Sequence, residues 1–202
     1  SRGGRCDGRR STVKIDGMEI LPRSFYDRNA KEVAPEILGM HLERTIAGET
    51  HVGRIVEVEA YLGPHDLAAH TSKGRTKRTS VMFGPPGYAY VYLIYGMYHC
   101  LNAVTGPGDH ASAVLIRALE PISGIVGATN GPGRLCRAMD IDLTLYGYDL
   151  TLGGDLTIAR PSEPGEPFTI AVGPRIGVDY AKEWVLEPLR FSIAGNPFLS
   201  RR

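Results

Sequence analysis

Residues 53–63 read GRIVEVEAYLG, and their alternation of aliphatic and polar side chains constrains the fold more than any other stretch. A period of two over several residues is typical of a β-strand with one buried face. The aliphatic side chains fall on that face, which we expect to pack in a core. The other face carries Glu57, Glu59 and Tyr61, spaced by about 7 Å per two residues. We expect this acidic and aromatic face to point into a cleft or into solvent.

Two neighbouring stretches differ sharply in character. Residues 71–80, TSKGRTKRTS, contain four basic side chains and no acidic one, and we interpret them as a loop. Residues 88–100, YAYVYLIYGMYHC, contain five tyrosines. Alternation there predicts a strand, and Gly96 predicts a hairpin bend that places Tyr95 and Met97 near its tip.

The rest of the chain predicts a mixed fold. We expect a short helix over residues 35–41, because a proline fits the first turn of a helix, and another over 134–139. Residues 112–119 alternate like a strand, with Leu115 and Arg117 on one face. Short strands are expected around Leu145 and in 156–158, 168–172 and 189–193. We predict an α+β fold: one domain with a curved, mostly antiparallel β-sheet, flanking helices and a protruding β-hairpin.

Composition excludes several classes of protein. The chain has 202 residues, 43% of them hydrophobic, which suits one globular domain over residues 18–202. Residues 1–17 are expected to form a flexible leader. The net charge of +1 means that any nucleic-acid surface must come from local clustering. The three cysteines form no CxxC pair, so neither a zinc site nor a disulfide framework is expected. No apolar run is long enough to span a membrane.

Four side chains stand out on the strand faces that we place outside the core: Glu59, Tyr61, Tyr92 and Arg117. In one curved sheet they would line a pocket with an acid, two aromatic rings and a cation. Aromatic rings bind planar bases, basic side chains bind phosphates, and a side chain at a hairpin tip can wedge between base pairs. These are the parts that a base-flipping enzyme requires.

Five blocks of the sequence support this interpretation. They resemble, in the same order, segments of the alkyladenine (3-methyladenine, N-methylpurine) DNA glycosylase family. The five segments are IVEVEAYLGPHDLAAH, YVYLIYGMYHCLNAV, VLIRALEP, GPGRLC and PRIGVDYAKEW. The resemblance runs from about residue 21 to residue 200. It implies a monofunctional enzyme that flips alkylated or deaminated purines, including 7-methylguanine, hypoxanthine and ethenoadenine, out of duplex DNA. The enzyme would then hydrolyse the N-glycosidic bond and so start base excision repair.

The resemblance also implies roles for single residues. Glu59 would activate the attacking water, which Arg117 and the main-chain carbonyl of Ile176 would help to hold. Arg117 would also favour the ionised form of Glu59. The base-binding pocket would be formed by Tyr61, His70, Tyr92, Asn102 and Leu115. Tyr95 would intercalate into the DNA, and the backbone would be contacted by Arg75, Lys77, Arg78, Met97 and Arg134.

The expected partners are damaged double-stranded DNA and water, with no cofactor, no metal and no membrane. We expect a monomer that works inside the cell together with DNA.

Two alternatives remain open from the residues alone. Glu57 and Glu59 have a spacing that suits an O-glycoside hydrolase with an acid and a base, and a non-catalytic module could stack single-stranded nucleic acid on tyrosines. We favour a supporting role for Glu57, and structural roles for Tyr88, Tyr90 and Tyr98.

Overall fold

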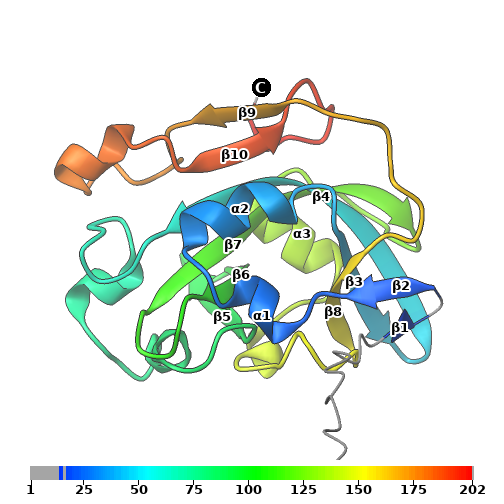
Figure 1. The fold of residues 1–202 in the computed structure, drawn as a ribbon, viewed down its shortest axis with the longest axis horizontal. Coiled ribbons are helices and arrows are strands. Elements are labelled where there is room, and N and C mark those ends of the chain that lie inside the picture. The colour runs from blue at the N-terminus through cyan, green and yellow to red at the C-terminus, as the bar shows by residue number, and fades with distance from the viewer. Residues whose placement is uncertain (1–13, 16, 202) are drawn as a thin grey trace, which may run out of the picture.

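A single ten-stranded antiparallel sheet forms the framework of the computed structural model, which describes residues 14, 15 and 17–201 (Figure 1). Its strands are β1 (Lys14–Ile15), β2 (Met18–Ile20), β3 (His41–Ile46), β4 (Glu49–Tyr61), β5 (Ala89–Ile94), β6 (Tyr98–Thr105), β7 (Ser112–Ser123), β8 (Leu156–Arg160), β9 (Ile170–Gly173) and β10 (Arg190–Ile193). They follow the order β1-β2-β8-β3-β4-β7-β6-β5, and β10 joins β4 to β9. The predicted α+β class with a mostly antiparallel sheet is confirmed, whereas the leader predicted over residues 1–17 lies almost wholly outside the described residues.

Among the described residues, three α-helices and four short 3-10 helices complete the fold. They are α1 (Arg23–Tyr26), α2 (Ala30–Ile37), α3 (Pro132–Ala138), η1 (His70–Lys73), η2 (Ser80–Phe83), η3 (Leu143–Leu145) and η4 (Lys182–Leu186). α2 packs against β4 and β7, and α3 packs against β6 and β7. The buried side chains of the three α-helices join those of the sheet in one large core. The strand expected around Leu145 is wrong, because that residue belongs to η3.

The helix expected over residues 35–41 is also wrong in its bounds. α2 begins earlier because the side chain of Asn29 accepts a hydrogen bond from the main-chain N–H of Lys31, at 2.9 Å, and so caps the helix. Pro35 lies inside α2 and not in its first turn. The chain leaves the helix after Ile37, and Gly39 turns it with a positive φ of 83° toward β3.

The central strand β4 is buried on both faces, not on one. Its residues from Val56 to Ala60 have no exposed surface, and these include Glu57 and Glu59. Two main-chain N–H groups from the C-terminal part of the chain, of Ile176 and of Ser200, donate hydrogen bonds to these two carboxylates. The acidic face is therefore covered by a distant segment, which local alternation does not reveal.

The hairpin predicted from the tyrosine-rich stretch is confirmed. β5 and β6 pair in register from Ala89 with Ala103 to Ile94 with Tyr98. At the tip, Tyr95 and Gly96 both have positive φ, of 53° and 67°. This turn leaves the side chain of Tyr95 85% exposed and that of Met97 61% exposed.

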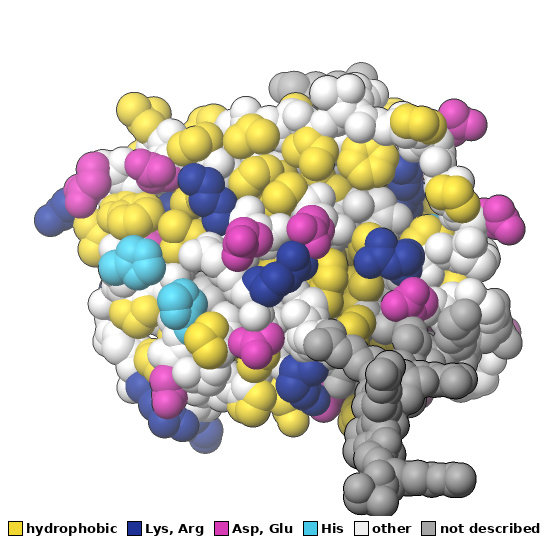
Figure 2. Space-filling view, in the orientation of Figure 1, with side chains coloured by type: hydrophobic (Ala, Val, Ile, Leu, Met, Phe, Trp, Pro, Cys, Tyr) yellow, Lys and Arg dark blue, Asp and Glu magenta, His cyan; other side chains and the backbone are white. Residues whose placement is uncertain are grey.

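The face drawn in Figure 2 mixes acidic and basic side chains between broad hydrophobic areas, and the described residues in view form no continuous basic surface. Within the described part of the chain, no helix has both the length and the apolar content that a membrane span requires.

Candidate active site

The acidic face of β4 meets an arginine from the neighbouring strand β7 at a β-bulge. Ile116 pairs with Val58 and Ala118 pairs with Glu57, so Arg117 is an extra residue with no direct partner on β4. Bulges commonly redirect a side chain beside an active site. Here the guanidinium of Arg117 reaches two buried carboxylates at once. Its Nε lies 3.1 Å from Glu57 and its Nη1 lies 3.4 Å from Glu59.

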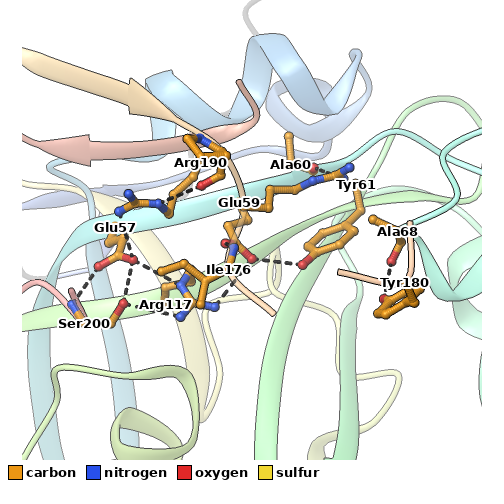
Figure 3. A network of polar contacts seen from close by, with 12 residues as sticks. Glu57, Glu59, Ala60, Tyr61, Ala68, Arg117, Ile176, Tyr180, Arg190 and Ser200 are labelled. Atoms are coloured by element: carbon orange, nitrogen blue, oxygen red, sulfur yellow. Dashed lines mark hydrogen bonds and ion pairs between the residues drawn. The ribbon is translucent and has the colours of Figure 1, made fainter. Parts of the chain in front are cut away.

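Glu59 receives hydrogen bonds from three different parts of the chain (Figure 3). The main-chain N–H of Ile176 donates to Oε2 at 2.7 Å, and the hydroxyl of Tyr61 donates to Oε1 at 2.9 Å. Arg117 approaches the same Oε1. These donors fix the orientation of a carboxylate whose side chain has no exposed surface. Ile176 thus contacts Glu59 through its N–H group.

Burial raises the pKa of Glu59 above its ordinary value, and repulsion from Glu57 adds to this rise. Arg117, the Ile176 N–H and the Tyr61 hydroxyl act in the opposite direction, but the net shift is upward. The guanidinium therefore favours the ionised form, as the sequence indicates, without fully offsetting the burial. A carboxylate with a raised pKa is a better proton acceptor once it is ionised. Tyr61 stays a donor, because burial and Glu59 raise its own pKa well above the usual range.

Glu57 is bound by a different set of groups, which contact both of its carboxylate oxygens. Its oxygens accept hydrogen bonds from the N–H and the hydroxyl of Ser200, both at 2.7 Å, and from Arg117. Arg190 adds an ion pair at 3.6 Å. Neither Glu57 nor Glu59 lines the small cavity beside Tyr61, but Glu59 binds the lining residue Tyr61 through a hydrogen bond. This arrangement supports a structural role for Glu57 and disfavours the O-glycoside hydrolase alternative, which needs two accessible carboxylates.

A small cavity of about 50 Å³ lies beside Tyr61. Its lining includes three further tyrosines and one histidine, and its members are Tyr61, Ala68, His70, Met82, Tyr90, Tyr92, Asn102, Gly177, Val178 and Tyr180. A cavity that binds a single benzene ring measures about 150 Å³, so this cavity is too small for the two-ring system of a purine. Its walls must move outward to admit a base.

His70, Tyr90 and Tyr92 form one aromatic cluster on this cavity. The Nδ1 of His70 lies 2.9 Å from the Tyr90 hydroxyl, and its ring meets that of Tyr92 edge to face at 4.5 Å. A planar base cannot lie between His70 and Tyr92 unless one of them moves. Burial, together with the nearby charges of Arg78 and Lys73, lowers the pKa of His70 to about 4. The imidazole is therefore neutral at physiological pH.

Of the remaining predicted pocket residues, one lines the cavity and one does not. Asn102 lines it, and its side-chain amide donates to the main-chain oxygen of Tyr90 at 3.2 Å. Leu115 is buried in β7, where it pairs with both Glu59 and Asn102, and it does not line the cavity. Leu115 thus lies in the sheet between the carboxylate and the pocket.

The predicted DNA-contacting side chains are exposed and lie on three separate elements. Lys77 and Arg78 follow η1, and they line a second hollow, of about 570 Å³, together with Tyr92 and Leu93. The guanidinium of Arg78 stacks 5.0 Å from the centre of the Tyr92 ring, so it also belongs to the edge of the pocket.

The other predicted contacts are Arg75, Met97 and Arg134. Arg75 lies over the ring of Phe83. Arg134 is exposed on α3 and donates to the side chain of Asn130. Met97, at the hairpin tip, borders a groove that also includes Arg137 of α3.

The sequence analysis missed several residues of the site. Tyr90 lines the cavity, although we expected a structural role, and Tyr180 lines it from the segment after β9. Asp66 and Arg175 form a buried ion pair next to Ile176 and Tyr61. All of them lie in segments that carry the family resemblance, and that was the available signal: Asp66 is in IVEVEAYLGPHDLAAH, Tyr90 begins YVYLIYGMYHCLNAV, and Arg175 and Tyr180 are in PRIGVDYAKEW.

No group of three or more His, Cys, Asp or Glu side chains among the described residues could hold a metal ion. Cys100 and Cys136 are free and buried, and burial raises the pKa of both thiols. Neither thiol is therefore suited to act as a nucleophile.

Comparisons with known proteins identify the family of this chain. The model of the family described as Methylpurine-DNA glycosylase (MPG) matches residues 24–197. Three bacterial relatives carry the name "Putative 3-methyladenine DNA glycosylase". The protein of Legionella pneumophila strain Corby is 59% identical over 184 residues, covering 91% of this chain and 100% of the relative. The proteins of Myxococcus xanthus strain DK1622 and Bacillus cereus strain B4264 are 49% and 46% identical, over 91% and 90% of this chain and 95% and 98% of their own lengths. The chain therefore belongs to the methylpurine-DNA glycosylase family, a family of DNA-repair hydrolases that act on N-glycosyl bonds.

Proposed function

We propose that this chain is a monofunctional DNA glycosylase that flips a methylated purine out of duplex DNA and hydrolyses its N-glycosidic bond, with Glu59 as the general base. One observation carries the proposal. Glu59 is fully buried, is oriented by three donors, and shares one of them, Tyr61, with a cavity lined by tyrosines.

The chemistry follows from this placement. Glu59 accepts a proton from a water molecule as the water oxygen bonds to the anomeric carbon of the deoxyribose. The N-glycosidic bond breaks, its electron pair leaves with the purine, and the products are a free base and an abasic site. The negative charge of Glu59 also stabilises the oxocarbenium-like transition state. Arg117 holds the carboxylate, and we propose that the main-chain carbonyl of Ile176 helps to hold the water.

The pocket favours cationic purines such as 3-methyladenine and 7-methylguanine. The faces of Tyr61, Tyr90 and Tyr92 attract a positively charged ring. His70 is neutral because its pKa is about 4, so it does not repel that charge. Hypoxanthine and ethenoadenine leave only after protonation, and His70 is a weak proton source at neutral pH. We therefore propose that these neutral purines are slower substrates.

Monofunctional chemistry is supported by the lining of the cavity, in which the described residues include no lysine. A lyase would need an amine to form a Schiff base with the sugar.

The DNA surface combines the hairpin tip with nearby basic side chains. Tyr95 fills the space that the flipped nucleotide leaves. Arg75, Lys77, Arg78 and Arg134, with Met97, contact the backbone. We propose that the protein acts as a monomer on damaged duplex DNA inside the cell.

The test is an excision panel with wild-type and Glu59→Gln proteins. The substrates are a methylated duplex, whose released bases are separated by chromatography, and duplexes with single hypoxanthine or ethenoadenine. We expect wild-type protein to release methylpurines fastest and the variant to bind the DNA with base release nearly abolished. Undiminished release by the folded variant would remove Glu59 from its role.

A further inference from the structure

Asp66 and Arg175, which lie 109 residues apart in the chain, form a two-pronged ion pair whose side chains have no exposed surface. Nη1 of Arg175 lies 2.5 Å from Oδ2 of Asp66, and Nη2 lies 2.9 Å from Oδ1. Neither residue lines the cavity, and the reaction as described above uses neither of them. They nevertheless lie next to groups that bind Glu59, the proposed catalytic carboxylate.

Arg175 adjoins two of the three groups that hold Glu59. Ile176, the next residue, donates its N–H to Oε2 of Glu59. The guanidinium of Arg175 lies 4.9 Å from the centre of the Tyr61 ring, whose hydroxyl donates to Oε1. Nη1 also donates to the main-chain oxygen of Ala60, at 3.0 Å, between Glu59 and Tyr61. One side chain therefore fixes both the segment that carries Ile176 and the ring of Tyr61.

Asp66 also binds main-chain groups of the segment that forms part of the pocket wall. Its two oxygens accept the main-chain N–H groups of Leu62 and Ala68, both at 3.0 Å. Ala68 lines the cavity, and its main-chain oxygen accepts the hydroxyl of Tyr180, another lining residue (Figure 3). The ion pair thus joins the loop after β4 to the segment before η4.

A buried ion pair contributes little net stability to a fold, because the cost of desolvating two charges offsets much of their attraction. Arg175 also leaves its Nε–H without a hydrogen-bond acceptor among the described residues. Replacing a buried ion pair by an apolar pair of similar volume is often neutral for stability. What an apolar pair could not do is hold Ile176 and Tyr61 in a fixed direction.

We infer that the Asp66–Arg175 pair is a positioning device that keeps Glu59 in its reactive orientation through the Ile176 N–H and the Tyr61 hydroxyl. The inference rests on the proposed role of Glu59 as general base. Asp66 and Arg175 act through other residues and contact no reacting atom.

This arrangement has a consequence for the pH dependence of the reaction. The charged and titratable groups that shift the pKa of Glu59 are Arg117, Tyr61 and Glu57. Besides burial, Glu59 in turn raises the pKa of Tyr61, Tyr92, Cys100 and Tyr180. Arg190 of β10 pairs in register with Glu59, but its ion pair is with Glu57. Loss of the Asp66–Arg175 ion pair leaves Glu57 and Arg117 in place. It weakens the hydrogen bonds from the Ile176 N–H and the Tyr61 hydroxyl, which both lower the pKa of Glu59. That pKa then rises further, and the rate falls off at a higher pH.

The experiment measures single-turnover release of methylpurines from methylated duplex DNA against pH, for wild type, Arg175→Met, Arg175→Lys and Asp66→Asn. We expect the acid limb of the profile to move up on the order of one pH unit in Arg175→Met and Asp66→Asn. At a pH below that limb the rate then falls about tenfold. Arg175→Lys keeps the charge with fewer contacts, so its limb should lie between those of wild type and Arg175→Met.

The control is Arg23→Met, which breaks the ion pair of Arg23 with Asp149 in a part of the fold that does not touch Glu59. It should leave the acid limb where it is in wild type. A purely structural role for Arg175 predicts the same unchanged limb with a smaller active fraction, and this result in folded Arg175→Met or Asp66→Asn would overturn the inference. If Arg175→Met shows no cooperative melting transition, the profile of the near-isosteric Asp66→Asn protein decides between the two roles.

Two further variants separate this inference from the proposed function. Tyr61→Phe removes one of the two hydrogen bonds, so its limb shift should combine with that of Arg175→Lys less than additively. Fully additive shifts would contradict the inference. Glu59→Gln is run in the same assay. If it retains activity, the proposed function fails. If it is inactive while the Arg175 and Asp66 profiles stay unshifted, only the positioning inference fails.

Discussion

The buried carboxylate site and the exposed DNA-contacting surface are built in opposite ways. Glu59 has no exposed surface and depends on partners from β4, β7 and the C-terminal segment. Tyr95, by contrast, is almost fully exposed at a turn that its immediate neighbours determine. The proposed chemical step therefore depends on long-range tertiary contacts, whereas the proposed DNA contact depends on local exposed side chains. Substitutions in the two regions should have different effects on rate, stability and salt dependence.

The largest expected effect on the rate comes from β4, where substitutions of Glu59 and Glu57 should have different consequences. Glu59→Gln should reduce the single-turnover rate about 10²–10⁴-fold, the usual contribution of a general base, while the protein still folds and binds DNA. Glu57→Ala should instead reduce stability by about 3–5 kcal/mol, because it leaves Arg117 buried with one partner fewer. Thermal melting and base release, measured on both variants, test the contrast. The distinction between the two carboxylates fails if Glu57→Ala melts like wild type but cannot release bases.

The hairpin tip should give the next largest effect. Tyr95→Gly removes the ring that we propose fills the space of the flipped base, and we expect about a tenfold to hundredfold loss of single-turnover rate. The turn itself should not weaken, because Tyr95 has a φ of 53°, which glycine adopts without strain. Non-specific DNA affinity should change little. As a control, Leu152→Ala removes another largely exposed hydrophobic side chain elsewhere, and equal losses in the two variants would argue against a wedge.

The pH profile of the wild-type enzyme tests the electrostatics of the buried site. As the proposed general base, Glu59 would act only when ionised, and burial raises its pKa. Base release should therefore be constant at high pH and fall about tenfold per pH unit below the pKa of Glu59. The midpoint should lie above that of an exposed glutamate, about 4.3. Rates on a methylated duplex, in buffers of constant ionic strength, give the midpoint. A midpoint below about 4 would mean that the surrounding donors outweigh the burial.

The smallest effect is expected from a single basic side chain. Lys77→Ala should weaken binding to damaged and undamaged duplexes alike and reduce the salt slope of the affinity by about 1. Arg78→Ala should in addition change lesion preference, because Arg78 also stacks on Tyr92. Fluorescence anisotropy titrations at several salt concentrations measure both. The division of roles is wrong if Lys77→Ala changes only lesion preference.

The same contrast explains what the sequence could predict. The alternation in residues 53–63 and 112–119 correctly indicated β4 and β7, and the position of Gly96 correctly indicated the hairpin tip. These features depend on residues that are close together in the chain. The cap that Asn29 provides to α2 is also local, but we gave Pro35 more weight, and the helix bounds were wrong for that reason.

Features that depend on distant residues were not predictable from these patterns. Ser200 binds Glu57 across 143 positions, and Arg175 binds Asp66 across 109. No periodicity records such pairs, so the burial of the acidic face of β4 and the positioning pair came only from the structure. The family resemblance did identify Glu59, Arg117 and Ile176, and the structure brings all three together.

The most direct test of the account is a crystal structure of the Glu59→Gln protein bound to a duplex that carries one lesion purine. The account predicts the purine outside the helix, in an enlarged cavity against Tyr61, His70 and Tyr92, with the anomeric carbon facing residue 59 and the ring of Tyr95 in the space left behind. A lesion that stays stacked in the duplex, or that binds far from residue 59, would contradict it.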